Sequence, residues 1–114
     1  MENRILNEDE IDNRFILDYS KAIKLIKEEV AKKLPDFKIV EINDKKETYY
    51  YYVIIKKDTI QIKIGGDRGS LLFEITIDQN QHYLDEDIAH KLRAASEKNI
   101  SLIINIIAQE IKEM

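Results

Sequence analysis

Thr48-Tyr49-Tyr50-Tyr51-Tyr52-Val53-Ile54-Ile55 is the stretch of this sequence with the strongest preference for a β-strand. Aromatic and β-branched residues favour strands because their side chains pack well on a pleated surface. The stretch opens a region, residues 47–78, that we expect to form most of a sheet on which the rest of the chain packs. Successive side chains of a strand point to opposite faces, so Tyr49 and Tyr51 should share one face and Tyr50 and Tyr52 the other.

Four strands are expected, at residues 36–42, 47–56, 59–64 and 71–78. Turn-forming residues separate them at 43–46 and at 57–58, and the glycine-rich segment 65–70 is expected to be a loop. Connections this short join neighbouring antiparallel strands, so the four strands should form a meander.

Helical periodicity flanks the predicted sheet on both sides. Apolar residues recur at three- and four-residue steps over residues 7–34, with Asn7 as the expected N-cap. Asp18 and Ser20 are also good helix starters, so one long helix or two shorter ones are both compatible with the pattern. After the last strand, Asp85 is the expected N-cap of a helix that either continues or breaks at residues 96–99. The predicted fold is α+β, with one N-terminal helix, a four-stranded antiparallel β-meander and one or two C-terminal helices in a single domain, residues 1–114.

The expected register assigns the side chains to two faces. If the turn at residues 57–58 is tight, Ile55 pairs with Ile60, and the following loop pairs Ile64 with Leu71. One face is then apolar and should form the core; it contains Tyr49, Tyr51, Val53, Ile55, Ile60, Ile62, Ile64, Leu71, Phe73, Ile75 and Ile77. The opposite face is mixed; it contains Tyr50, Tyr52, Ile54, Gln61, Lys63, Leu72, Glu74 and Thr76.

Two arrangements of the helices are possible around this sheet. In the first, a terminal helix covers the mixed face and gives a sandwich of helix, sheet and helix; the presence of at least two amphipathic helices favours it. In the second, both helical segments pack on the apolar face and leave Tyr50 and Tyr52 exposed as a recognition surface. Tyrosine is enriched at the energetically important positions of protein interfaces.

Composition narrows the classes of function. The formal net charge is −4, from 22 acidic and 18 basic residues, which argues against nonspecific nucleic-acid binding. Cysteine is absent, which excludes disulfides, thiolate metal sites and cysteine nucleophiles. The start, Met1–Arg4, lacks the pattern of a secretory signal, and no apolar run is long enough to cross a bilayer. We therefore expect a cytoplasmic protein that does not enter a membrane.

Three groups of residues are candidates for sites of chemistry. His82, Glu86 and His90 have a spacing that could hold a divalent metal, but no further strong ligand accompanies them, so solvated residues at a helix start are expected. Lys63 and Glu74 resemble the lysine and carboxylate that some metal-dependent nucleases carry on neighbouring strands. Such a site needs at least two carboxylates to hold magnesium, and only Glu74 is well placed, so an ordinary exposed charge pair is expected. The glycine-rich segment leads into a strand without a following lysine and therefore does not match a phosphate-binding loop. No catalytic residue, metal site or cofactor is predicted.

These observations favour a small acidic, non-enzymatic module that binds another protein. An inhibitor-type protein, for example a toxin immunity protein or a phage anti-defence protein, fits the size, the acidity and the lack of catalytic residues. The residues expected to contact the partner are Tyr50, Tyr52, Lys63, Arg68 and Glu74. The alternatives are a structural homodimer through the apolar helix Ile100–Ile111 and a metal-dependent hydrolase or nuclease.

Overall fold

The computed structural model describes residues 6–45 and 49–114. Met1–Arg4 and the beginning of the second predicted strand, Glu47 and Thr48, lie outside the described residues. In chain order the elements are η1 (Glu8–Glu10), α1 (Tyr19–Lys33), β1 (Lys38–Asn43), β2 (Tyr50–Lys57), β3 (Ile60–Asp67), β4 (Ser70–Ile77), β5 (Asn80–His82), α2 (Glu86–Lys91) and α3 (Glu97–Lys112).

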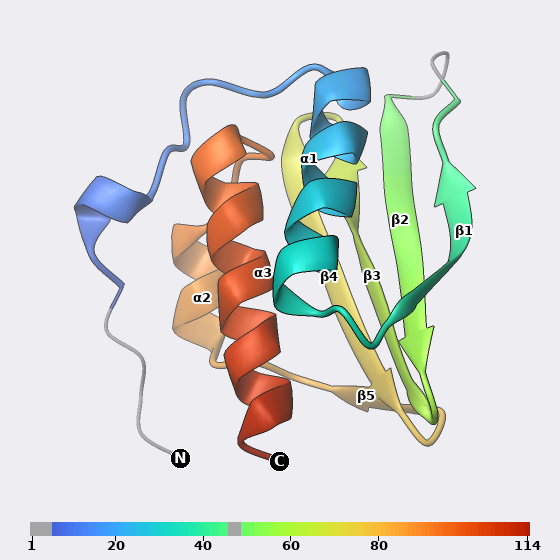
Figure 1. Cartoon of the computed structure of the whole chain (residues 1–114). Helices are drawn as coiled ribbons and strands as arrows, with labels where there is room; N and C mark the ends of the chain where they lie inside the picture. The colour runs from blue at the N-terminus through green and yellow to red at the C-terminus, as the bar shows by residue number, and fades with distance from the viewer. Residues whose placement is uncertain (1–5, 46–48) are drawn as a thin grey trace.

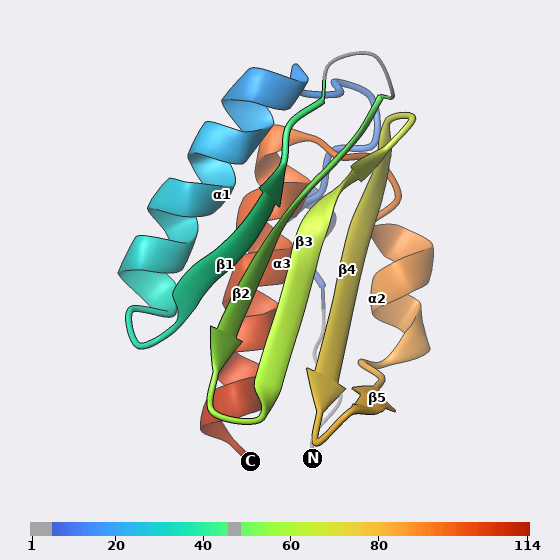
Figure 2. The ribbon, with the colours of Figure 1, turned by 90° about the vertical axis from the view of Figure 1, so that its right-hand side faces the viewer.

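The elements form two layers, with an antiparallel sheet on one side and the helices on the other (Figures 1 and 2). The strands follow the order β1-β2-β3-β4-β5, so the predicted α+β fold and meander are confirmed. The prediction missed one strand, β5, whose three residues pair with the end of β4 after a tight turn at Asp78 and Gln79. Helix α1 packs on β2 and β3, and α3 packs on α1 and β4. None of the helices in the described part is long and apolar enough to cross a membrane.

The N-terminal segment follows the alternative of two shorter helices. Asn7 caps only the single 3-10 turn η1, where its side chain accepts a hydrogen bond from the backbone N–H of Asp9. Asp18 caps α1 by accepting from the backbone N–H of Ser20. Residues 11–17 between them form an extended strap, which makes a β-bridge from Ile16 to Ser96. The α-helix therefore begins at the Asp18 cap, and the apolar periodicity of residues 7–17 does not produce an α-helix there.

Both hairpin turns are centred one residue later than expected, and this shifts the register. Lys57 pairs with Ile60 across a two-residue turn, so Ile55 lies opposite Ile62 and Ile64 opposite Phe73. Residues 65–70 do not form a loop, because Gly65–Asp67 extend β3 and only Arg68 and Gly69 turn, both with positive φ. Both shifts amount to two residues, which returns each side chain to the face that was predicted for it.

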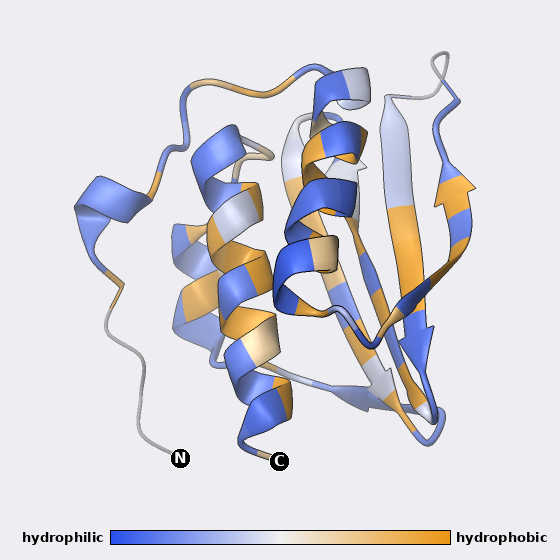
Figure 3. Cartoon of the chain, in the orientation of Figure 1, coloured by the Kyte–Doolittle hydropathy of each residue, from blue (hydrophilic) through white to orange (hydrophobic). Residues whose placement is uncertain are grey.

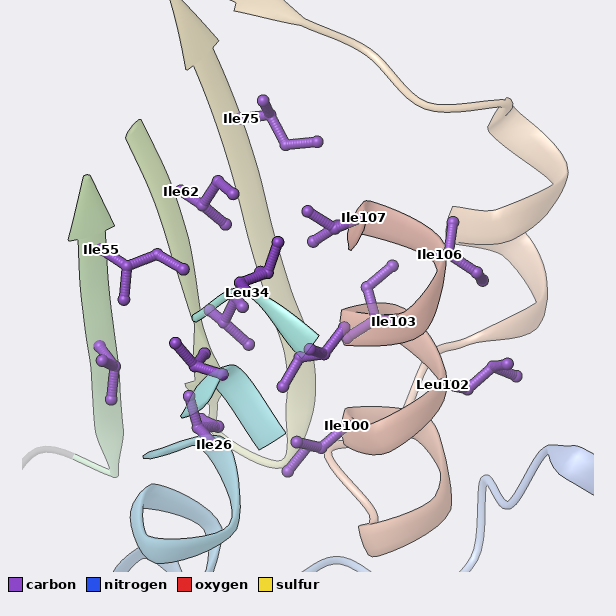
Figure 4. Packing of buried hydrophobic residues seen from close by; sticks show 14 of the residues in the cluster. Ile26, Leu34, Ile55, Ile62, Ile75, Ile100, Leu102, Ile103, Ile106 and Ile107 are labelled. Carbon is purple, nitrogen blue, oxygen red and sulfur yellow. The ribbon is translucent and has the colours of Figure 1, made fainter. Parts of the chain in front are cut away.

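The core lies between the helices and the apolar face of the sheet (Figure 4). Ile26 of α1 and Ile103 of α3 are fully buried against strand residues such as Ile62. In Figure 3 the hydrophobic residues of these helices lie in stripes that alternate with hydrophilic ones. The prediction that Tyr49 belongs to the core is wrong. Tyr49 precedes β2 with a φ of 53° and is 76% exposed, because the strand begins one residue later.

Helix α3 is apolar on two sides because it is covered on two sides. Leu102 and Ile106 point away from the sheet, toward the side on which α2 lies, and both are buried (Figures 1 and 4). Ile100, Ile103 and Ile107 are buried on the side of the sheet and α1. The apolar excess of this helix, on which the homodimer alternative rested, is thus accounted for within one chain.

Candidate functional site

One face of the sheet is turned away from the helices, and no helix of the described residues, 6–45 and 49–114, covers it (Figure 2). The predicted sandwich of helix, sheet and helix is therefore wrong, and the second predicted arrangement is the observed one. A helix layer forms on one side only, because α1, α2 and α3 are all needed to cover the apolar face and one another. We call the exposed layer the open face; it carries Glu41 of β1, Tyr50, Tyr52 and Ile54 of β2, Gln61 and Lys63 of β3, and Leu72, Glu74 and Thr76 of β4.

Lys63 lies in the middle of the open face, over two tyrosine rings. Its Nζ is 4.4 Å from the ring centroid of Tyr52 and 5.4 Å from that of Tyr50. The two rings contact each other, with centroids 5.4 Å apart and planes tilted by 58°. An ammonium is attracted to the electron-rich face of an aromatic ring, so these contacts hold all three side chains in place.

The charge of Lys63 is stabilised by its surroundings. A hydrogen bond with Tyr50 raises the pKa of Lys63, and the Glu74 carboxylate adds to the rise, although partial burial acts in the opposite direction. Glu74 lies directly across from Lys63 on β4. The expected pairing of Ile64 with Leu71 would have placed Glu74 opposite Gln61; this is wrong, since the shift of two residues places Gln61 opposite Thr76. The lysine is therefore a fixed positive charge at the centre of the face.

Lys63, Tyr50 and Tyr52 form a group that we call the tyrosine cluster. Glu41 contacts this cluster, and its role was not predicted. The hydroxyl of Tyr52 donates a hydrogen bond to Oε2 of Glu41, and this bond is the main reason that the pKa of Tyr52 is raised. A β-bulge after Ile39 moves Glu41 opposite Ile54 and thereby onto the open face. A bulge has no clear signal in a single sequence, which explains why the role of Glu41 was missed.

Arg68 lies at the border of the open face and not within the tyrosine cluster. It occupies the turn between β3 and β4, and its side chain is 87% exposed, with Nε 3.7 Å from the carboxylate of Asp67. Its backbone N–H donates to the carbonyl of Tyr49. Since Tyr50 pairs with Asp67, the turn places Arg68 beyond the Tyr50 end of the face.

The structure places His82 on a different element from the other two candidate metal ligands, Glu86 and His90. His82 lies in β5, where its Nε2 is 2.8 Å from Oε2 of Glu110 on α3, while Glu86 and His90 are exposed on α2. Within the part of the chain that the structure describes, no three histidine, aspartate or glutamate side chains are close enough to share a metal ion. His82 instead connects the short edge strand to the last helix.

Comparisons with known proteins do not add a family to this geometry. No protein-family model, no curated protein and no solved structure matches the chain. Function must therefore be inferred from the physical properties of the site.

Proposed function

We propose that this chain is a small acidic, non-enzymatic module that binds another protein through the open face. The observation that carries the proposal is an uncovered sheet face on which Lys63 is held over Tyr50 and Tyr52. Large exposed apolar and aromatic surfaces on a sheet are characteristic of interaction sites. Tyrosine combines a large contact area with a polar hydroxyl and is enriched among residues that dominate binding energy.

The order within the cluster supports tight binding. Side chains that are mobile in the free protein lose conformational freedom on association, which costs about 0.5–1.5 kcal/mol for each long side chain. Here the contacts of Lys63 with two rings, and of Tyr52 with Glu41, already restrict these side chains. The partner would meet a surface whose side chains are largely fixed before it binds.

The charges on the open face support selectivity. Lys63 lies at its centre, with Glu74 on one side and Glu41 on the other, and Arg68 lies at its border. A partner must match this pattern of both signs, because like charges brought together at an interface are unfavourable. An inhibitor-type protein, such as a toxin immunity protein or a phage anti-defence protein, needs such selectivity for one target.

The test is capture of the partner by matched tyrosine variants. The wild-type chain is immobilised, bound proteins from the source cell or its natural competitor are identified by mass spectrometry, and affinity for the main partner is measured. The double variant Tyr50→Ala/Tyr52→Ala should weaken that affinity by at least about 30-fold, which corresponds to the roughly 2 kcal/mol of a single interface hot-spot residue. Tyr83→Ala removes an exposed tyrosine outside the open face and should leave affinity unchanged.

Two results would contradict the proposal. One is full partner affinity in the double variant; the other is an equal loss in the double variant and in Tyr83→Ala. Melting temperatures measured in parallel separate binding from folding. Tyr50 and Tyr52 are half-buried and outside the core, so we expect only a small change in stability.

A further inference from the structure

Strand β1 forms one edge of the sheet, and no strand of the described residues pairs with its outer side (Figures 1 and 2). The opposite edge is largely occupied. There β5 pairs with the end of β4, and at the start of β4 the backbone N–H of Leu71 donates to the carbonyl of Arg93. Strand β5 itself has only three residues, Asn80–His82, all of them polar. The six residues of β1 therefore form the longer free edge, and backbone groups on such an edge are a template for another strand.

The side chains of β1 extend past the area that the helices cover. Ile39 and Ile42 lie opposite Ile55 and Val53 and therefore point to the helix side of the sheet. Helix α1 packs on β2 and β3, so Ile39 and Ile42 stay 42% and 37% exposed. Many natural edge strands point a charged side chain inward, which opposes pairing with another chain. On the helix side β1 has isoleucines instead, and a strand added to this edge would bury part of their surface.

The β-bulge makes β1 complementary to a second copy of itself. Two copies pair antiparallel along their full length when Lys38 of one lies opposite Asn43 of the other, and Ile39 opposite Ile42. Directly opposite residues must point to the same face of a sheet. Residues five or three positions apart point to opposite faces of a regular strand, which would forbid this register. The bulge after Ile39 instead places Lys38 and Asn43 on the side of the open face, and Ile39 and Ile42 on the helix side.

The charges of β1 suit the same register. Lys38 and Glu41 are the charged residues of the strand, and both point to the side of the open face. When Lys38 lies opposite Asn43 of a second copy, its diagonal neighbour is Glu41 of that copy. Diagonal neighbours are about 7–8 Å apart, which long side chains can bridge. A two-fold axis repeats the contact, so the two copies would share two pairs of opposite charge.

We propose that β1 binds a second copy of this chain, antiparallel and in the register that places Ile39 opposite Ile42. The two-fold axis is perpendicular to the sheet, so the two five-stranded sheets become one continuous sheet with all helices on one side. Both open faces then lie side by side on the other side. Glu41, which accepts from the hydroxyl of Tyr52, lies next to the junction. The proposal does not depend on the proposed function, and it would make the binding surface bivalent.

The first measurement is the mass of the full chain in solution as a function of concentration. The contact is one six-residue strand from each copy, which is small for a protein interface. We therefore expect a weak dimer, with a dissociation constant of about 10–300 μM. Sedimentation velocity and NMR diffusion between about 20 μM and 1 mM should show a rise toward twice the monomer mass. A chain that stays monomeric throughout this range overturns the proposal.

The variant Ile42→Lys tests whether β1 is the interface. It places a lysine against Ile39 of the other copy at both symmetric positions, so we expect dimerisation to weaken by at least about 10-fold. Tyr83→Lys is the matched control, because Tyr83 is 79% exposed and lies outside β1, and it should leave the dissociation constant unchanged. Circular dichroism verifies that both variants are folded. A dimer that Ile42→Lys leaves intact, or that both variants weaken equally, overturns the proposal.

A charge exchange tests the register. Lys38→Glu and Glu41→Lys each place like charges at both diagonal contacts, so each variant alone should dimerise more weakly than the wild type. Mixed together, the two variants have opposite charges at both contacts. Unlabelled Glu41→Lys titrated into ¹⁵N-labelled Lys38→Glu should shift the amide signals of residues 38–43, with about 5- to 10-fold higher affinity than unlabelled Lys38→Glu. Equal affinity in the two titrations overturns the proposal.

Discussion

Replacement of Asn99 should release the strap, residues 11–17, that runs between η1 and α1. Asn99 is 0% exposed and lies in the first turn of α3. Its Oδ1 accepts from the backbone N–H of Asp12 at 3.0 Å, and its Nδ2 donates to Oδ1 of Asn13 at 3.0 Å and to the carbonyl of Ala94 at 2.9 Å. One side chain therefore joins the strap to the segment that precedes α3.

The expected loss of stability in Asn99→Ala follows from these three hydrogen bonds. A neutral hydrogen bond contributes about 0.5–1.5 kcal/mol net, and a buried group left without a partner costs about 1–3 kcal/mol. Asn99→Ala removes all three bonds and leaves a small cavity, so we expect the free energy of unfolding to fall by about 2–4 kcal/mol. For a domain of this size the melting temperature should fall by roughly 8–16 °C.

Urea denaturation followed by far-UV circular dichroism measures the effect, and Asn105→Ala is a matched control. Asn105 lies in the same helix but is exposed, and alanine has the higher helix propensity, so the control should be neutral or more stable by a few tenths of a kcal/mol. Hydrogen exchange should also accelerate at Leu17, whose backbone N–H donates to the carbonyl of Ala95. The reasoning is refuted if Asn99→Ala and Asn105→Ala have the same stability within about 0.5 kcal/mol.

Two further substitutions test the packing of α1 and of the strands. The Ser101 hydroxyl, and to a lesser degree Lys33, lowers the pKa of Glu29 below 4.5, so this carboxylate stabilises the fold above that pH and loses its contribution as the pH falls through the folded pKa. Glu29→Gln should therefore be less stable than the wild type by about 1 kcal/mol at pH 7, with the difference shrinking toward pH 3, whereas Glu28→Gln on the exposed side should match the wild type at pH 7. Gly66→Ala should cost about 1–3 kcal/mol in thermal or urea unfolding, because a Cβ there would lie 2.6 Å from the Tyr51 hydroxyl. The cost should shrink when Tyr51 is replaced by leucine, and an undiminished cost would contradict the steric explanation.

The sequence predicted the faces of the strands better than their register. Ile55 was expected opposite Ile60 and lies opposite Ile62, yet both residues point toward the helices as predicted. Side-chain alternation has a period of two, so an error of two residues leaves the faces unchanged. Tyr50, Tyr52, Lys63 and Glu74 were therefore placed correctly on one face of the sheet, although their cross-strand pairs were not predicted and the favoured arrangement had a helix covering that face.

Contacts between distant segments were beyond the reach of sequence patterns. The pairing of Glu41 with Tyr52 depends on a bulge, and the bonds of Asn99 depend on a strap more than 80 residues earlier in the chain. Asn99 lies at a predicted helix break, where a polar residue is ordinary and gives no indication of burial. The burial of the Tyr51 hydroxyl beside Gly66, with Asp18 nearby, likewise depends on segments that are distant in the sequence.

The sequence by itself determined the elements other than the short strand β5, their antiparallel order and the two faces of the sheet, because caps, turns and side-chain alternation act over a few residues. The tertiary structure decided whether a helix also covers the mixed face of the sheet. That face carries some apolar residues, and local patterns cannot show whether a helix packs on them; the outcome depends on where α1, α2 and α3 bury the most apolar surface together. That outcome left Tyr50 and Tyr52 on the uncovered face around Lys63, and it is the physical basis of the proposed binding face.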